Sequence, residues 1–183
     1  GLLLEATYEA IKSEDPEAEV LPGSINSASF FVYLLKDLTK RGDYEKAVGL
    51  LNLYAGDFSE FPPVKGREEL ESFCSNSLVD RPYQFLDYFF KGCSGFYDIF
   101  SFHDYRNYAS SERFGYLLDL VKTAVSQNGS KKLLVFTSIG KDMNASASDS
   151  GQAMAVMKRL TLASSYGADM VLWWCFKDVP GKD

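Results

Sequence analysis

The sequence predicts an α/β protein in which buried strands alternate with helices along the chain. The clearest strand is Lys132–Thr137, where four apolar residues follow one another between a Lys and a short polar stretch. Such a run is typical of a parallel strand that is covered on both faces. Similar apolar runs occur at 97–103 and 169–176, and stretches with helical spacing separate them. Repeated βα units of this kind predict a parallel sheet with right-handed crossovers.

The elements follow from local signals taken in chain order. Residues 2–12 predict a helix that ends before Asp15-Pro16, because proline has no N–H to donate and disfavours helix in the residue before it. Ser110-Ser111-Glu112 combines hydroxyl caps with an early acid and predicts the start of another helix. The other expected elements are a strand near 19–22, a loop at 22–24, a helical region at 28–56 broken at 41–43, a loop at 56–69, a helix at 81–91, strands near 97–103, 132–138 and 169–176, and a helix at 153–163.

Length and composition limit the classes of protein. The chain has 183 residues, enough for one well-buried domain, and we assign residues 1–183 to a single domain. The net charge is −6, and no run of Lys or Arg occurs, which argues against a nucleic acid or an anionic membrane surface as partner. Aromatic residues make up 15% of the chain. They fill cores and also line carbohydrate clefts, so a neutral ligand such as a sugar is compatible.

Cysteine and histidine usage bears on cofactors and on the cell compartment. The three cysteines and one histidine show no metal-ligand spacing, so we expect no metal and no cofactor. Cys175 lies in an apolar strand, whereas a disulfide between Cys74 and Cys93 stays open as an alternative. No apolar run approaches the ~20 residues of a membrane span. Leu2-Leu3-Leu4 is too short for the apolar region of a signal peptide, so we expect the chain to begin inside a domain.

Polar residues follow the expected strands at their carboxyl ends. In parallel α/β folds, ligands bind outside these ends, so Ser138 and His103 mark the expected site. His103 is the only histidine, and its sequence position suits either a ligand contact or a hydrogen-bonded structural role.

Four segments together resemble retaining glycoside hydrolases of the clan A-like superfamily, which are built on (β/α)8 barrels. Thr137-Ser138-Ile139-Gly140 resembles the Thr-Glu-x-Gly that ends their seventh strand. Residues 97–105 resemble a sixth strand ending in His-x-Tyr, residues 171–178 an eighth strand with a substrate-stacking Trp, and residues 12–21 the entry to the fifth strand. The resemblance implies a (βα)4 half of a TIM barrel, the last four βα units, with the N-terminal half absent.

The resemblance also implies roles for individual residues. Ser138 occupies the position of the nucleophilic Glu. His103 would contact a sugar hydroxyl, and Tyr105 would hydrogen-bond the group at position 138. Trp173 and Trp174 alternate in direction on a strand, so one belongs to the core and the other stacks on the sugar, with Trp174 preferred. Asp178 either orients a site residue or is a solvated loop acid.

The chemistry of position 138 decides what the chain can catalyse. Retaining hydrolysis needs two carboxyl groups about 5–5.5 Å apart, and a serine hydroxyl cannot replace the nucleophile unaided. The chain is therefore expected to be inactive as written, with Ser138 either natural or engineered and the acid/base Glu upstream of residue 1. A serine-hydrolase reading with His103 and either Asp104 or Asp178 lacks the Gly-x-Ser-x-Gly elbow.

Three hypotheses about function remain open from the sequence. The chain is part of a glycoside hydrolase that acts on an oligo- or polysaccharide, a non-catalytic carbohydrate-binding protein, or a half-barrel that self-associates without a sugar site. The implied protein partner is a second copy in a homodimer or a missing N-terminal half-barrel. The family favours an extracellular or periplasmic location.

Overall fold

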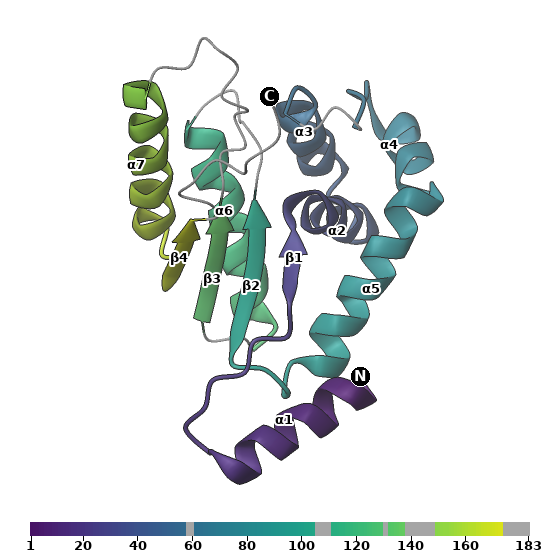
Figure 1. The fold of residues 1–183 in the computed structure, drawn as a ribbon. Helices are drawn as coiled ribbons and strands as arrows, with labels where there is room; N and C mark the ends of the chain where they lie inside the picture. Colours follow the sequence, from purple (N-terminus) through teal and green to yellow (C-terminus); the bar gives the residue numbers. More distant parts are fainter. Residues whose placement is uncertain (58–60, 105–110, 130–131, 138–148, 174–183) are drawn as a thin grey trace, which may run out of the picture.

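The computed structural model describes residues 1–57, 61–104, 111–129, 132–137 and 149–173. Within these residues, helices and strands follow each other as the sequence predicts for an α/β protein (Figure 1). The elements are α1 (Leu2–Glu14), β1 (Ser24–Asn26), α2 (Ser27–Lys40), α3 (Tyr44–Tyr54), α4 (Arg67–Cys74), α5 (Ser77–Cys93), β2 (Ile99–Asp104), α6 (Ser111–Gln127), β3 (Lys132–Thr137), α7 (Asp149–Ser165) and β4 (Met170–Trp173).

The four described strands form one parallel sheet in the order β1-β2-β3-β4. Each strand therefore lies beside the next one in the chain, and all four arrows in Figure 1 point the same way. The α/β class and the parallel sheet predicted from the sequence are confirmed. Because all strands run in one direction, their carboxyl ends meet at one edge, where ligands bind in folds of this type.

The first strand corrects the prediction of a strand near 19–22. Residues 19–22 lie outside the sheet, and β1 begins at Ser24, after Gly23 with its positive φ of 80°. The apolar Val20 instead docks at the amino end of β2, where its N–H donates to the Asp98 carboxylate over 2.9 Å and its carbonyl accepts from the N–H groups of Asp98 and Ile99. The apolar residues at 19–22 therefore mark the segment that bonds to the amino end of β2, and not a strand of the sheet.

The other expected elements agree more closely with the structure. The break at 41–43 separates α2 from α3, with Gly42 at a φ of 83°. The predicted strands near 97–103, 132–138 and 169–176 correspond to β2, β3 and β4, while residues 138 and 174–176 lie outside the described part. The expected loop at 56–69 is too long, because α4 begins at Arg67. Early acids favour this start, and the Glu69 carboxylate accepts a hydrogen bond from the Lys65 N–H.

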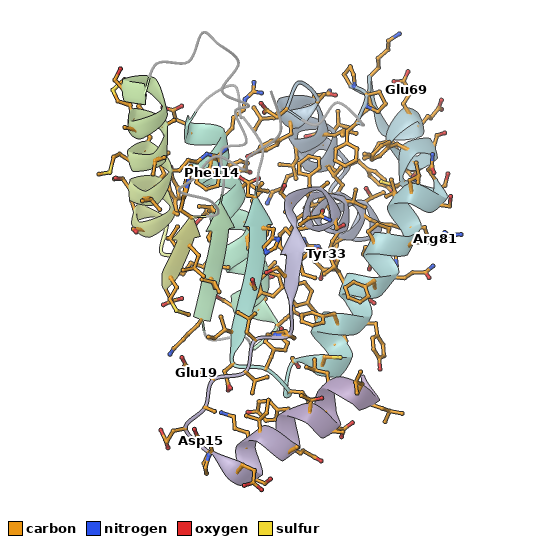
Figure 2. All side chains as sticks on the ribbon, viewed as in Figure 1. Asp15, Glu19, Tyr33, Glu69, Arg81 and Phe114 are labelled. Carbon is orange, nitrogen blue, oxygen red and sulfur yellow. The ribbon has the colours of Figure 1, made fainter. Side chains whose placement is uncertain are left out.

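The hydrophobic core lies on one face of the sheet, which we call the core face. Side chains alternate along each strand, and this face carries Ile25, Phe100, Phe102, Leu133, Val135 and Val171. Helices α2 and α5 pack on it through aromatic rings: Phe30 of α2 contacts Phe100 and Phe102, and Phe90 of α5 stacks on Phe100. The ring of Tyr33 on α2, labelled in Figure 2, packs against Tyr83 and Phe90 of α5. The aromatic load read from the sequence therefore goes largely into packing.

The opposite face, which we call the site face, carries none of the residues of that core cluster. The register assigns to it Ser24, Asn26, Ile99, Ser101, His103, Lys132, Leu134, Met170 and Leu172. Ile99 and Leu134 near the middle of the sheet are buried, whereas Met170 and Leu172 at the β4 edge are 38% and 48% exposed. The site face is therefore most open along β4.

The two described cysteines do not form the disulfide that the sequence left open as an alternative. Cys74 and Cys93 are both buried and free. Burial raises the pKa of the Cys74 thiol, which keeps it protonated and unreactive in the folded chain. In the part of the chain that is described, no helix is long and apolar enough to cross a bilayer.

One buried hydroxyl gives a test of the packing around β2. The Tyr97 hydroxyl is buried without a hydrogen-bond partner among the described residues, and burial raises the pKa of this phenol to about 12. An unsatisfied buried hydroxyl costs about 1–3 kcal/mol, so we expect Tyr97→Phe to raise the free energy of unfolding by about 1 kcal/mol. Tyr83→Phe is the matched control, because the Tyr83 hydroxyl donates to Asp87 over 3.3 Å and its loss should destabilise. Urea denaturation measures the free energy of unfolding of both variants. A change in the same direction for Tyr97→Phe and Tyr83→Phe would contradict the prediction.

Candidate functional site

The candidate site lies at the carboxyl end of the sheet, on the site face. Of the residues expected there from the sequence, the structure describes His103 and Trp173. Ser138, Tyr105, Trp174 and Asp178 lie outside the described residues, so their predicted roles stay predictions. Along the chain, residues 105, 138 and 174 come directly after β2, β3 and β4, respectively.

His103 is the penultimate residue of β2 and belongs to the site face. Its Cα pairs in register with Asn26 of β1 on one side and with Phe136 of β3 on the other. The imidazole is half-buried, and this burial lowers its pKa below the ordinary value of 6.5. At neutral pH the ring is therefore uncharged, with one nitrogen that donates and one that accepts a hydrogen bond.

Asn26 is a site residue that the sequence analysis missed. It ends β1, is exposed, and caps α2, because its side-chain Oδ1 accepts a hydrogen bond from the Ser29 N–H over 2.8 Å. This cap occupies the oxygen, and no bond from the amide Nδ2 is seen within the described residues. An Asn directly before Ser-Ala-Ser is a helix-start signal, but a strand expected near 19–22 and a loop at 22–24 do not put Asn26 at the end of a strand.

A second polar layer lies one step below Asn26 and His103. Ser24 and Ser101 are the preceding site-face residues of β1 and β2, and their hydroxyl groups contact each other directly. Ser101 is fully buried, so this contact satisfies a hydroxyl inside the sheet. The site face at β1 and β2 therefore carries two layers of neutral polar side chains.

Trp173 lies on the other face of the sheet. Its Cα pairs with Thr137, which in turn pairs with Asp104, so Trp173 follows Val171 on the core face. Alternation along the strands thus separates Trp173 from His103, and the structure does not bring these two predicted site residues together. Trp174 lies outside the described residues, so the expectation that it stacks on a sugar stays a prediction.

A buried ion pair supports the carboxyl end of β2 from the core face. The Asp104 carboxylate is fully buried and accepts a hydrogen bond from Arg159 of α7 over 2.6 Å. The Arg159 guanidinium also lies 4.2 Å from the ring centre of Phe114 on α6. The pair therefore ties the last residue of β2 to two helices, directly beside His103 in the chain.

A second ion pair supports the same edge of the molecule. Arg113, near the start of α6, donates to the buried carboxylate of Asp57 over 2.8 Å, just after α3. The Tyr54 hydroxyl donates to the Arg113 carbonyl, and burial raises the pKa of this phenol well above its usual value. Both ion pairs join residues far apart in the sequence, and no local pattern signals them.

The titration of His103 gives a test of its surroundings. Because its pKa is lowered on folding, the unfolded chain takes up the proton first as the pH falls. The stability that neutral His103 contributes is therefore complete above about pH 6.5 and decreases as the pH falls from there through the lowered pKa of the folded state. Between pH 7.5 and 5.5 we expect His103→Gln to lose less unfolding free energy than the parent chain, as measured in urea at both pH values. Identical losses would contradict the lowered pKa, since His103 is the chain's only histidine.

Comparison with known proteins found no match for this chain among family models, curated proteins or solved structures. Function is therefore inferred from the site's own chemistry. Asn26, His103, Ser24 and Ser101 are uncharged at neutral pH and supply hydrogen-bond donors and acceptors. The described acid nearest in the chain, Asp104, is held by Arg159 on the opposite face. This arrangement suits recognition of a neutral polar ligand.

Proposed function

We propose that this chain binds carbohydrate at the carboxyl end of its sheet and that it represents half of a (β/α)8-type barrel. The observation that carries the proposal is the pairing of Asn26 with His103 on the site face, at the carboxyl ends of strands that follow one another in chain order. Sugar hydroxyls are neutral groups that both donate and accept hydrogen bonds. An amide and a neutral imidazole offer the complementary groups without the cost of burying a charge.

Strand order supports the barrel part of the proposal. A doubly wound sheet reverses its strand order at a switch point and is covered by helices on both faces. In this chain the described order is sequential, and the core cluster draws on one face of the sheet only. Sequential parallel strands with helices outside are the arrangement of (β/α)8 barrels, whose ligands bind at the carboxyl ends.

Binding is proposed here without hydrolysis by the chain itself. The resemblance to retaining glycosidases places Ser138 where their nucleophilic Glu stands, and a hydroxyl cannot form and release the glycosyl ester in the same way. Hydrolysis would require a nucleophilic carboxylate at that position and a second carboxylate as acid/base. A non-catalytic carbohydrate-binding role is therefore favoured over O-glycosyl hydrolysis for this sequence.

The test uses Asn26, because one substitution can keep its role as the cap of α2 and remove its role as an amide donor to the ligand. Asn26→Asp keeps an oxygen that caps α2 but replaces the amide donor, so stability should change little. We expect the affinity for the best-bound oligosaccharide among cellohexaose, xylohexaose and mannohexaose to fall about tenfold, which equals about 1.4 kcal/mol. Titration calorimetry measures the affinity.

Asn76→Asp is the matched control for this test. Asn76 caps α5 through the same kind of bond, from the Leu78 N–H to its Oδ1 over 2.9 Å. This control should bind as tightly as the parent chain. The proposal would be wrong if the parent bound none of a wider panel of neutral glycans, or if both variants weakened binding equally.

A further inference from the structure

The sheet has two open edges within the described residues. β1 and β4 lie at the two ends of the order β1-β2-β3-β4, and each pairs with one described strand only. An unpaired edge presents a row of backbone N–H and C=O groups that can pair with another strand.

Exposed apolar side chains lie on β4 and on the helix that packs next to it. Met170 and Leu172 of β4 are partly exposed on the site face. The neighbouring helix α7 exposes Met154 and Met157, each to 63%, although it packs on α6 and β4. A soluble surface rarely gathers large apolar residues on two adjoining elements unless another surface covers them.

The β1 side of the sheet has a similar apolar flank. Figure 1 shows α5 beyond β1, at the end of the sheet opposite to α7, and the amino end of α1 beside the lower end of α5. Phe85 and Tyr88 of α5 and Leu2 of α1 are largely exposed there, and Gly1 lies close to the Tyr88 hydroxyl. By contrast, α2, which packs on α5 and against the sheet, exposes no large apolar side chain within the described part.

We propose that a second copy of this chain covers both flanks, with β4 of each copy pairing with β1 of the other. The two contacts are related by a two-fold axis, so one pairing implies the other and no edge is left open. Four parallel strands from each copy make eight, the number in a closed (β/α)8 barrel, with Met170 and Leu172 facing its interior. This inference rests on the half-barrel proposed above and does not depend on the sugar ligand.

The first test measures mass in solution. Sedimentation equilibrium of the 183-residue chain should give twice the 20.5 kDa of one copy, dissociating on dilution. Met170→Lys combined with Leu172→Lys should shift the protein to a monomer with an unchanged circular dichroism spectrum. Lysine is chosen because each copy carries a net charge of −6. Added lysines make this charge less negative, so stronger repulsion between the copies cannot explain the loss of the dimer. Met157→Lys on α7 serves as a second variant in case the double change prevents folding.

Leu53→Lys is the matched control for the mass measurement. Leu53 is 39% exposed, like Met170, but lies on α3 rather than on β4 or α7. It should leave the dimer intact. A folded parent chain that is monomeric at all concentrations would overturn the proposal, and so would equal dissociation by Leu53→Lys.

Cross-linking tests which edges meet. In a Cys175→Ser background, Ser24→Cys on β1 and Leu172→Cys on β4 together should give covalent dimers with a short bismaleimide. Each single variant should stay uncross-linked, because β1 meets β4 rather than another β1. Two strands separate β1 from β4 within one copy, so the short linker cannot join them there. Dimers from a single variant would overturn the proposed pairing. If the chain forms a dimer but binds no glycan, only the proposal of carbohydrate binding is contradicted. If the chain is a monomer and binds glycans, only the proposal of a dimer is contradicted.

Discussion

Phe30→Ala is expected to lower the free energy of unfolding by about 3–5 kcal/mol, the range for removing a large aromatic side chain from a core. Phe30 is completely buried, and its ring centre lies 6.0 Å from Tyr33, 6.4 Å from Phe90, 6.1 Å from Phe100 and 5.9 Å from Phe102. The ring therefore joins α2, α5 and β2 at one point. A cavity there removes contacts on three elements, and a domain of this size has only about 5–15 kcal/mol of stability in total.

Phe85→Ala is the control that separates packing from aromatic content. Phe85 is 58% exposed on α5, so its removal should change the unfolding free energy of the monomer by about 0.5 kcal/mol or less. Urea denaturation followed by circular dichroism measures both, at concentrations low enough to keep the chain monomeric. If Phe30→Ala does not fold, Phe30→Leu should show a smaller loss in the same direction. Equal effects of Phe30→Ala and Phe85→Ala would mean that the aromatic cluster does not support the fold as described.

The Phe30 cluster also shows why the helices could be predicted from the sequence. Phe30, Phe31, Leu34 and Leu35 follow helical spacing, and the chain breaks at Arg41-Gly42-Asp43, so the local pattern contains the element and its end. The strand expected near 19–22 fails for the opposite reason. Ser24-Ile25-Asn26 has little apolar character, and its pairing with β2 is decided by residues 77 positions away in the chain.

In the candidate site, too, some features follow from local sequence and others depend on residues far apart in the chain. Its location was predictable, because polar residues follow apolar strands and parallel strands end at one edge. This pattern predicts the place of His103 at the end of a strand. The place of Asn26 beside His103 follows only from the register of β1 and β2. The Asp104–Arg159 pair joins positions 55 residues apart, and nothing in either local pattern marks these two residues as partners.

Arg159→Met is expected to destabilise the chain by about 3–5 kcal/mol, because it removes a cation that is paired with a buried carboxylate. Asp104 is fully buried and the Arg159 side chain is only 8% exposed, so water replaces little of the lost interaction. The guanidinium also covers the Phe114 ring, and methionine restores part of that apolar contact. Loss of the charge, rather than loss of packing, should therefore dominate the effect seen in urea denaturation.

Two further variants decide whether the charge is responsible. Asp104→Leu combined with Arg159→Met removes both charges, and apolar replacement of a buried pair is often close to neutral, so the double variant should recover much of the loss. Arg67→Met breaks an ion pair of similar length, 2.8 Å to Glu71, on the exposed surface of α4 and should change little. A double variant less stable than Arg159→Met would mean that Asp104 makes stabilising contacts besides the one to Arg159, and it would contradict the explanation by unbalanced charge.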